Sequence, residues 1–220
     1  AFKKLSGIFS ISIWDKINKS LFLIRDIVGV KPLYYKEKNG KLFFSTLIKP
    51  LLINDSNKLN LEAANYFFNF GYNSLSETYY KNIFKVLPGE LLIYKNHEIT
   101  KKKYLNFNFK KNFSDKLIKG KIVDIINKQS VSDVPISISL SGGVDSNIIL
   151  ASLNKQLNSY TISYSYNKEK SIDSICASQR AREYKTNHSE IVVTDDDFLG
   201  SLELVSDLIE EPIGNENLIS

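Results

Sequence analysis

The chain has 220 residues, of which 43% are hydrophobic and 24% are charged, values that exclude a disordered or fibrous protein. No apolar run approaches the length of a membrane span, and the single cysteine, Cys176, excludes a disulfide framework. We therefore expect a cytoplasmic protein without a membrane partner. The net charge of +5 combines a basic stretch, residues 1–130, with an acidic one, residues 131–220. The lysines are mostly scattered among predicted strands, which favours a solvated face and no nucleic-acid partner.

Alternating apolar and polar residues predict an antiparallel, β-rich first half. Asn39-Gly40 is a strong hairpin signal between two such runs, and Asn96-His97 marks a second turn. One helix is expected over residues 59–72, ending near Gly71. The predicted strands cover residues 7–15, 20–26, 31–37 and 41–47, with further strands between Val86 and Leu105.

The second half alternates predicted helices and strands, which is typical of βαβ units and a parallel sheet. We place the join between the two halves at residues 106–113, giving domains over 1–109 and 114–220. The predicted helices cover residues 114–130, 145–157, 172–185 and 197–209, and the predicted strands cover 135–140, 159–164 and 188–193.

A short Ser-Gly-Gly-x-Asp-Ser turn, residues 141–146, joins the first of these strands to the next helix. Ligands of open parallel sheets bind beyond the carboxyl ends of the strands, where this turn lies. Glycines let backbone N–H groups approach a polyanion, and the helix adds its positive end. Asp145 would repel bare phosphate, so we expect it to hold Mg²⁺. The lysine of the common phosphate loop is absent, but the pattern still predicts binding of a nucleotide's pyrophosphate.

The SGGVDS turn resembles the pyrophosphate loop of ATP pyrophosphatases, and the flanking segments resemble glutamine-hydrolysing asparagine synthetases. Upstream, the family pattern L-x-G-M-F-A-F-x-[IL]-W-D is similar to residues 5–15, R-D-x-x-G-x-K-P-L-Y-Y to 25–35, and F-A-S-E-x-K-A-L to 44–51. "SDVPISISLSGGVDSNII" resembles S-D-V-P-x-G-x-x-L-S-G-G-L-D-S-S, and "EEPIGN" resembles D-E-P-x-x-D. Matching residues before the turn are Leu5, Gly7, Phe9, Trp14, Asp15, Arg25, Asp26, Gly29, Lys31, Pro32, Leu33, Tyr34, Tyr35, Phe44, Ser45 and Lys49.

The resemblance implies an α+β glutaminase part, an incomplete Ntn-type αββα sandwich, followed by an incomplete α/β parallel-sheet ATP-pyrophosphatase domain. It implies that glutamine supplies ammonia, that ATP adenylates the aspartate side chain, and that ammonia displaces AMP to give asparagine. ATP, Mg²⁺, glutamine and aspartate are therefore the expected ligands, and a homodimer is expected. The residues implied to bind ATP or pyrophosphate are Leu140, Ser141, Gly142, Gly143, Asp145, Ser146, Ile162 and Glu211, with Asp145 and Glu211 also near the metal.

Some family features are missing. The nucleophilic cysteine would precede Ala1, and a second synthetase loop would follow Ser220, so this polypeptide alone is expected to make no product. Asn215 stands where the family pattern has an acid, which would weaken one Mg²⁺ ligand.

Several other residues favour structural roles over chemical ones. Cys176 is expected to be a packed thiol and His188 a structural or surface residue, while Arg25 and Asp26 would form an ion pair. Asp195–Asp197 at a helix start would serve as a cap.

Three alternatives stay open. The acceptor could be another carboxylate, in a sugar acid or a β-lactam precursor, because the residues that select it would lie past Ser220. A tRNA-thiolating enzyme would need redox cysteines or a basic RNA-binding face. A non-catalytic homologue would keep the fold alone, and Asn215 is the only hint of that.

Overall fold

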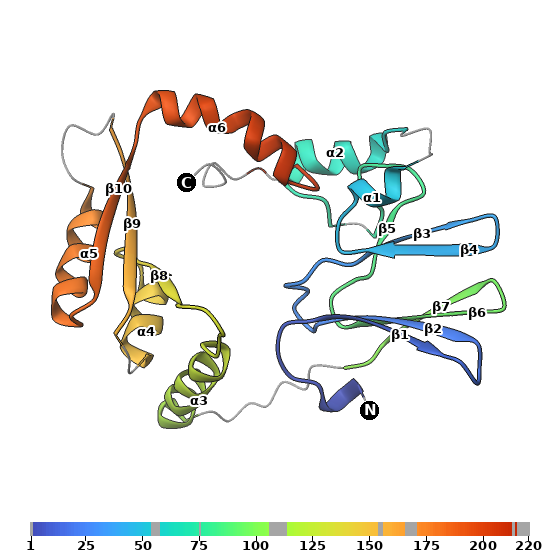
Figure 1. Cartoon of the computed structure of the whole chain (residues 1–220), viewed down its shortest axis with the longest axis horizontal. Helices are drawn as coiled ribbons and strands as arrows, with labels where there is room; N and C mark the ends of the chain where they lie inside the picture. The colour runs from blue at the N-terminus through green and yellow to red at the C-terminus, as the bar shows by residue number, and fades with distance from the viewer. Residues whose placement is uncertain are drawn as a thin grey trace. The chain divides into compact units, whose positions relative to one another are not determined.

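A computed structural model of the chain describes residues 2–53, 58–74, 76–105, 114–153, 156–165, 171–212 and 214. The chain divides into two compact units (Figure 1). The first unit comprises Ala1–Asn108 and Asp207–Glu216, and the second comprises Phe109–Ser206 and Asn217–Ser220. The expected join over 106–113 and the unusual Asn215 lie outside the described residues.

Antiparallel strands dominate the first unit, as the sequence predicts. One sheet has the order β1-β2-β6-β7 and a second has the order β4-β3-β5, and every pairing is antiparallel. The elements are η1 (Phe2–Lys4), β1 (Ser10–Asp15), β2 (Ser20–Arg25), β3 (Tyr34–Lys38), β4 (Lys41–Ser45), α1 (Lys49–Leu52), α2 (Leu61–Phe70), β5 (Phe84–Lys85), β6 (Glu90–Lys95) and β7 (Glu98–Lys103). The short α1 and β5 were not expected from the sequence, because neither is long enough to show a period.

The two predicted hairpin turns are confirmed by their backbone angles. Asn39 and Gly40 have φ values of 53° and 69°, and Asn96 and His97 have 50° and 64°. Two successive positive φ angles define the turn whose twist matches paired antiparallel strands. The turns also meet: Nδ1 of His97 lies 2.8 Å from the carbonyl oxygen of Gly40.

Local capping explains the bounds of α2. The side chain of Asn60 accepts hydrogen bonds from the N–H groups of Glu62 and Ala63. Gly71 ends the helix with a φ of 76° and donates its N–H to the carbonyl of Phe67. Asparagine at the start and a left-handed glycine at the end are favoured residues at these positions, so the predicted end at Gly71 is confirmed.

Arg25 and Asp26 each hold the loop that follows β2. The carboxylate of Asp26, which is completely buried, accepts hydrogen bonds from the N–H groups of Val28, Val30 and Lys31 at 3.0–3.2 Å. The Arg25 guanidinium donates to three carbonyl oxygens instead of to Asp26. The expected direct ion pair is therefore wrong, because backbone groups of the tight loop compete successfully for both side chains.

The second unit contains a parallel sheet of order β10-β9-β8, as the strand–helix alternation predicts. β9 lies in the middle, with β8 and β10 on either side (Figure 1). The elements are α3 (Asp115–Gln129), β8 (Ser137–Ser139), α4 (Val144–Ser152), β9 (Asn158–Tyr164), α5 (Ile172–Glu183), β10 (Asn187–Val193) and α6 (Asp195–Leu208).

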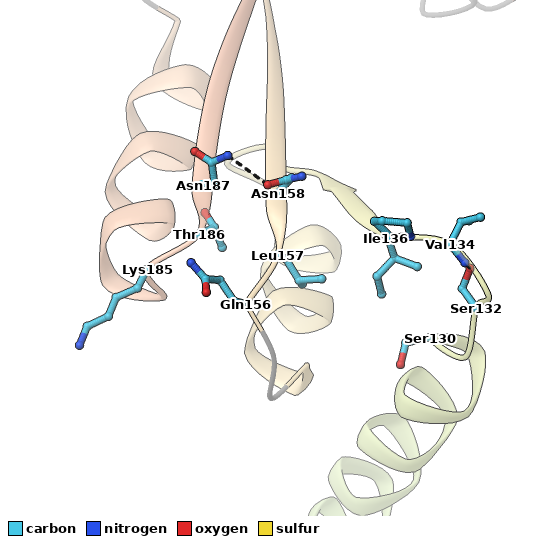
Figure 2. A pocket seen from close by; sticks show the side chains of 11 residues that line it. Ser130, Ser132, Val134, Ile136, Gln156, Leu157, Asn158, Lys185, Thr186 and Asn187 are labelled. Atoms are coloured by element: carbon cyan, nitrogen blue, oxygen red, sulfur yellow. Dashed lines mark hydrogen bonds between the residues drawn. The ribbon is translucent and has the colours of Figure 1, made fainter.

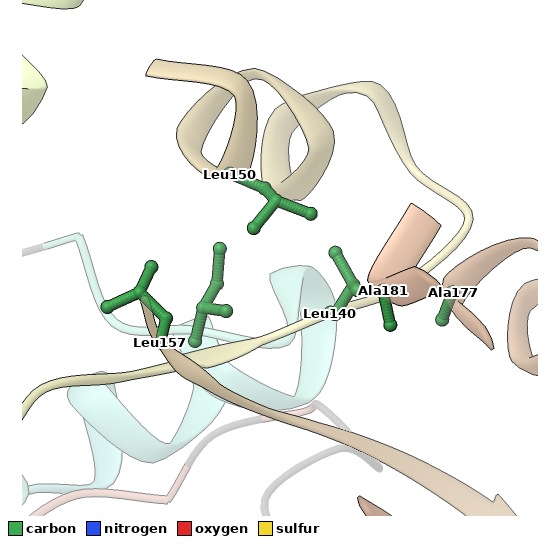
Figure 3. Packing of buried hydrophobic residues seen from close by; sticks show 6 residues of the cluster. Leu140, Leu150, Leu157, Ala177 and Ala181 are labelled. Atoms are coloured by element: carbon green, nitrogen blue, oxygen red, sulfur yellow. The ribbon is translucent and has the colours of Figure 1, made fainter. Parts of the chain in front are cut away.

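Side chains from β8, α4 and α5 form the core of the second unit (Figure 3). Leu140 and Leu150 are buried there with Ala177 and Ala181. Leu157, which precedes β9, belongs to the same cluster. The predicted helix over 145–157 is therefore too long: α4 ends at Ser152, since the chain must turn back to bring Leu157 and β9 into the sheet.

The start of α6 confirms the expected capping role for Asp197, one of the three aspartates there. The carboxylate of Asp197 accepts hydrogen bonds from the N–H and the hydroxyl of Thr194, and the Asp197 N–H donates to the Thr194 hydroxyl oxygen. This is a reciprocal capping box. None of the helices in the described part of the chain combines the length and apolar character that crossing a membrane requires.

Candidate functional site

The segment of residues 141–146, called the SGGVDS loop below, begins just after β8 and ends in the first turn of α4. Leu140 anchors its start and is 1% exposed. The Leu140 N–H donates to the carbonyl of Tyr160 at 2.8 Å, and the hydroxyl of Thr161 donates to the Leu140 carbonyl at 2.6 Å. The loop therefore begins from a fixed point on the sheet.

Three consecutive N–H groups of this loop each meet a side-chain oxygen. The N–H of Ser141 donates to Ser146 Oγ at 3.3 Å, and that of Gly143 donates to Ser141 Oγ at 3.2 Å. The N–H of Gly142 donates to Asp173 Oδ1, also at 3.2 Å. These bonds are at the long end of the normal range, so a better acceptor can replace them. The carboxylate of Asp173 demonstrates that an anionic oxygen fits at the loop.

Gly142 is required for a reason that the sequence did not reveal. A Cβ atom at this position would lie 2.5 Å from Asp173 Oδ1 and 3.2 Å from Asp173 Cα, so a side chain would force Asp173 and the loop apart. Sequence reasoning assigned the glycine to approach of a ligand and missed Asp173 altogether. The available signal was its place in the first turn of a predicted helix, two residues after the N-cap Ser171.

The other expected loop residues lie together at the start of α4. Ser146 Oγ lies 3.1 Å from Ser141 Oγ, and Asp145 is exposed in the first turn of the helix. In the described residues, no three His, Cys, Asp or Glu side chains gather closely enough to hold a metal ion.

Ile162, expected to contact adenosine through its backbone, lies on β9 two residues past Tyr160. The pairing of β8 with β9 ends at Tyr160, so Ile162 is beyond that ladder, on the side of the loop. It pairs with Ile191 of β10. Leu140 and Ile162 thus lie at the carboxyl ends of neighbouring strands, where the sequence places them.

Glu211 makes its contacts in the first unit. Its carboxylate lies 3.2 Å from Lys85 Nζ, and the two side chains are 17% and 11% exposed. Burial raises the pKa of Glu211, and the charge of Lys85 opposes that rise. The neighbouring Glu210 accepts hydrogen bonds from the N–H groups of Ile48 and Lys49, at the start of α1. The structure therefore gives Glu211 a cationic partner that sequence reasoning did not anticipate.

Two further residues have structural contacts. His188 Nδ1 lies 2.9 Å from the hydroxyl of the buried Ser159, which in turn lies 2.7 Å from Thr186 Oγ1. Cys176 is partly buried and lines a pocket of about 410 Å³ beside Gly142, between α4 and α5. The contacts of His188 fit the structural role expected for that residue.

Comparisons with known proteins agree with the order of the two units. Residues 1–105 match the family model described as glutamine amidotransferase domain, and residues 117–220 match the one described as asparagine synthase. Asparagine synthetase [glutamine-hydrolyzing] 1 of Bacillus subtilis is 35% identical over 69% of this chain and 25% of its own length. Putative asparagine synthetase [glutamine-hydrolyzing] 2 of Methanocaldococcus jannaschii is 28% identical over 97% of this chain and 44% of its own length.

The chain belongs to the glutamine-hydrolysing asparagine synthetase family. It spans between a quarter and less than half of the length of these two curated relatives. A third relative, Amidase chyE of Penicillium rubens, is 30% identical over 66% of this chain and 23% of its own length. The match to the synthase domain includes residues 207–212 and 214, which belong to the first unit of this asparagine synthetase homologue.

A pocket of about 630 Å³ lies at the amino-terminal ends of the three parallel strands (Figure 2). The SGGVDS loop follows the carboxyl end of β8 instead. The lining residues of the pocket include Ile136, Asn158 and Asn187, which precede or begin the three strands. Ligands of open parallel sheets bind at the carboxyl ends of the strands, so this pocket is not where the sequence predicts a nucleotide.

The buried pair of Lys85 and Glu211 predicts a large effect on stability. Replacing Lys85→Met leaves the Glu211 carboxylate buried without its cation, so the free energy of unfolding should fall by about 3 kcal/mol. The double variant Lys85→Met with Glu211→Gln removes both charges and should recover most of this loss. Urea denaturation of the three proteins measures the effect. A double variant as unstable as the single one would show that lost packing, and not an unpaired charge, is responsible.

Proposed function

We propose that the chain is part of an asparagine synthetase that hydrolyses glutamine, and that its SGGVDS loop binds the pyrophosphate portion of ATP. The observation that carries this proposal is the row of three loop N–H groups, each directed at an oxygen, one of them a carboxylate. Oxygens of a pyrophosphate group offer the same acceptors with more charge. The positive end of α4 adds to the attraction.

The proposed reaction forms an amide in two stages. The side-chain carboxylate of aspartate attacks the α-phosphorus of ATP and releases pyrophosphate, and ammonia from glutamine then displaces AMP. Without adenylation the carboxylate oxygen is a poor leaving group, which is why ATP is consumed. The first unit would belong to an Ntn-type αββα glutaminase and the second to an ATP-pyrophosphatase domain, with the boundary between residues 109 and 114. A homodimer and a cytoplasmic location are part of the same proposal.

The residues present fit Mg²⁺ bound together with phosphate oxygens. Asp145 is exposed at the start of α4 and would hold the ion, which would neutralise phosphate charge. Glu211 is the second proposed ligand of Mg²⁺. Its carboxylate forms an ion pair with Lys85 in this structure. To bind the metal it would have to give up that ion pair.

Another carboxylate acceptor is the second candidate. The relative called Amidase chyE shows that proteins of similar sequence carry names other than asparagine synthetase. Nothing at the SGGVDS loop depends on the acceptor, since the loop would contact only the nucleotide.

Product analysis of the whole protein tests the proposed function. Incubation with ATP, Mg²⁺, glutamine and aspartate should yield asparagine, glutamate, AMP and pyrophosphate in equal amounts. Consumption of ATP with a different carboxylic acid, and none with aspartate, would favour the second candidate. Formation of ADP and inorganic phosphate would contradict the adenylation chemistry.

Asp173 should compete with the ligand for the N–H of Gly142. Replacing Asp173→Asn keeps the shape but removes the negative charge beside the loop, so inorganic pyrophosphate without metal should bind about threefold to tenfold more tightly. Isothermal titration calorimetry with and without Mg²⁺ measures this. If the variant instead binds more weakly, and only when Mg²⁺ is present, Asp173 is a metal ligand and not a competitor.

A further inference from the structure

We propose that Asn147, in the first turns of α4, is a positioning residue for the SGGVDS loop; this inference rests on the proposed function. The side-chain nitrogen Nδ2 of Asn147 lies 2.6 Å from the carbonyl oxygen of Gly143 and 3.3 Å from that of Ser141. One amide group therefore contacts two carbonyls of the loop at once.

These contacts determine where two backbone N–H groups point. In a planar trans peptide, the C=O of one residue and the N–H of the next point in opposite directions. Holding the Ser141 carbonyl toward Asn147 therefore turns the Gly142 N–H away from it, toward the carboxylate of Asp173, where the structure places it. Holding the Gly143 carbonyl likewise sets the direction of the Val144 N–H, at the start of α4. Asn147 thus orients donors that an anion would use.

A serine could not do the same. Ser146 Oγ also lies 3.2–3.3 Å from both carbonyls, but a hydroxyl has one proton and can donate to only one of them at a time. A primary amide has two protons on one nitrogen and can donate to both.

The unsatisfied oxygen of Asn147 supports a specific role. Its Oδ1 is buried and has no hydrogen-bond partner among the residues that the structure describes. The two carbonyls fix the orientation of the amide, because only nitrogen can donate to them. A buried acceptor without a partner is unfavourable and rare in native proteins, and such groups concentrate where a function requires them. The hydrogen bonds from Asn147 to the two loop carbonyls offset the unfavourable burial of its Oδ1.

The test measures binding of inorganic pyrophosphate with Mg²⁺ to the whole protein by calorimetry. Asn147→Leu, which keeps the volume but removes both donors, should raise the Kd about tenfold, the size of one net hydrogen bond. The Kd of Asn147→Ser, which keeps one donor, should lie between those of Asn147→Leu and the wild type. Asn127→Leu is the matched control: Asn127 also donates from one nitrogen to two carbonyls, at 2.8 and 3.1 Å, but these belong to Val123 and Ser152. The Kd of Asn127→Leu for pyrophosphate should equal that of the wild type.

A spectroscopic measurement separates positioning from a general loss of structure. The amide proton resonances of Gly142 and Val144 should shift on adding pyrophosphate to the wild type and shift less in Asn147→Leu, while both leucine variants keep similar unfolding midpoints. An unchanged Kd in Asn147→Leu, with pyrophosphate bound normally by the wild type, would overturn the role of Asn147 alone. A wild type that binds no pyrophosphate would overturn the proposed function and this inference together.

Discussion

Replacing Gly142→Ala should lower the affinity for inorganic pyrophosphate, and any ATP-dependent activity of the whole protein, by about 100-fold, because preorganised anion donors would be displaced. The new Cβ would lie 2.5 Å from Asp173 Oδ1 and 3.2 Å from Asp173 Cα. The carboxylate can rotate away, but the Cα belongs to the backbone of α5 and cannot. The loop must therefore move, and this displaces its N–H groups. Calorimetric titration with pyrophosphate measures the loss.

Gly143→Ala is the matched control for this experiment. Its Cβ would lie 3.2 Å from Ser141 Oγ, a side chain that can shift to another rotamer, so the loss should stay below about tenfold. Adding Asp173→Ala to Gly142→Ala should restore binding in part, because it removes the 2.5 Å contact and leaves the 3.2 Å contact. Equal affinities of Gly142→Ala and wild type would contradict the explanation of why glycine is needed.

Replacing Asp26→Ala should destabilise the first unit by about 3 kcal/mol or more. The change leaves the N–H groups of Val28, Val30 and Lys31 without an acceptor in a loop where the carboxylate itself is completely buried. Each unsatisfied buried N–H costs about 1–3 kcal/mol, and water can relieve only part of this. Urea denaturation, followed by circular dichroism, measures the change in unfolding free energy.

Asp15 provides the comparison, because its carboxylate also accepts two backbone N–H groups, those of Ile17 and Asn18, but in an exposed turn. Asp15→Ala should have a much smaller effect, since water replaces the lost acceptor. If the two variants are equally destabilised, burial is not the cause.

The same carboxylate predicts a dependence on pH. Burial alone would raise the pKa of Asp26, but the N–H groups of Lys31 and Val30 outweigh it and lower the pKa below its usual value. A lowered pKa in the folded state means that the ionised form stabilises the protein. This contribution is complete above the unfolded-state pKa of about 3.9, and it is lost as the pH falls through the folded-state pKa. In Asp26→Asn this part of the acid sensitivity should disappear.

Periodicity and turn chemistry predicted most of the fold. The hairpin at Asn39-Gly40 and the helix end at Gly71 depend on local backbone preferences, which the residue types reveal directly. The parallel sheet followed from the alternation of strands and helices. The end of α4 was misplaced because it depends on Leu157 reaching a core formed by residues distant in sequence.

The candidate site was predicted only where it depends on neighbouring residues in the sequence. The SGGVDS loop forms a local motif, and its serines and glycines were identified from their spacing. The partners of that loop were not, because Asp173 comes from the next helix and reaches Gly142 only through the tertiary fold. The contact of Glu211 with Lys85 joins residues far apart in the chain and leaves no pattern in the sequence.

Exchange of radiolabelled pyrophosphate into ATP by the whole protein tests the central claim most directly, because it reports adenylation without requiring glutamine or ammonia. We predict exchange that depends on aspartate and Mg²⁺ and that is lost in Gly142→Ala but largely kept in Gly143→Ala. Exchange that is equally fast in Gly142→Ala, or no exchange with aspartate or with any other carboxylic acid, would contradict the assignment of the SGGVDS loop as the pyrophosphate site of an adenylating enzyme.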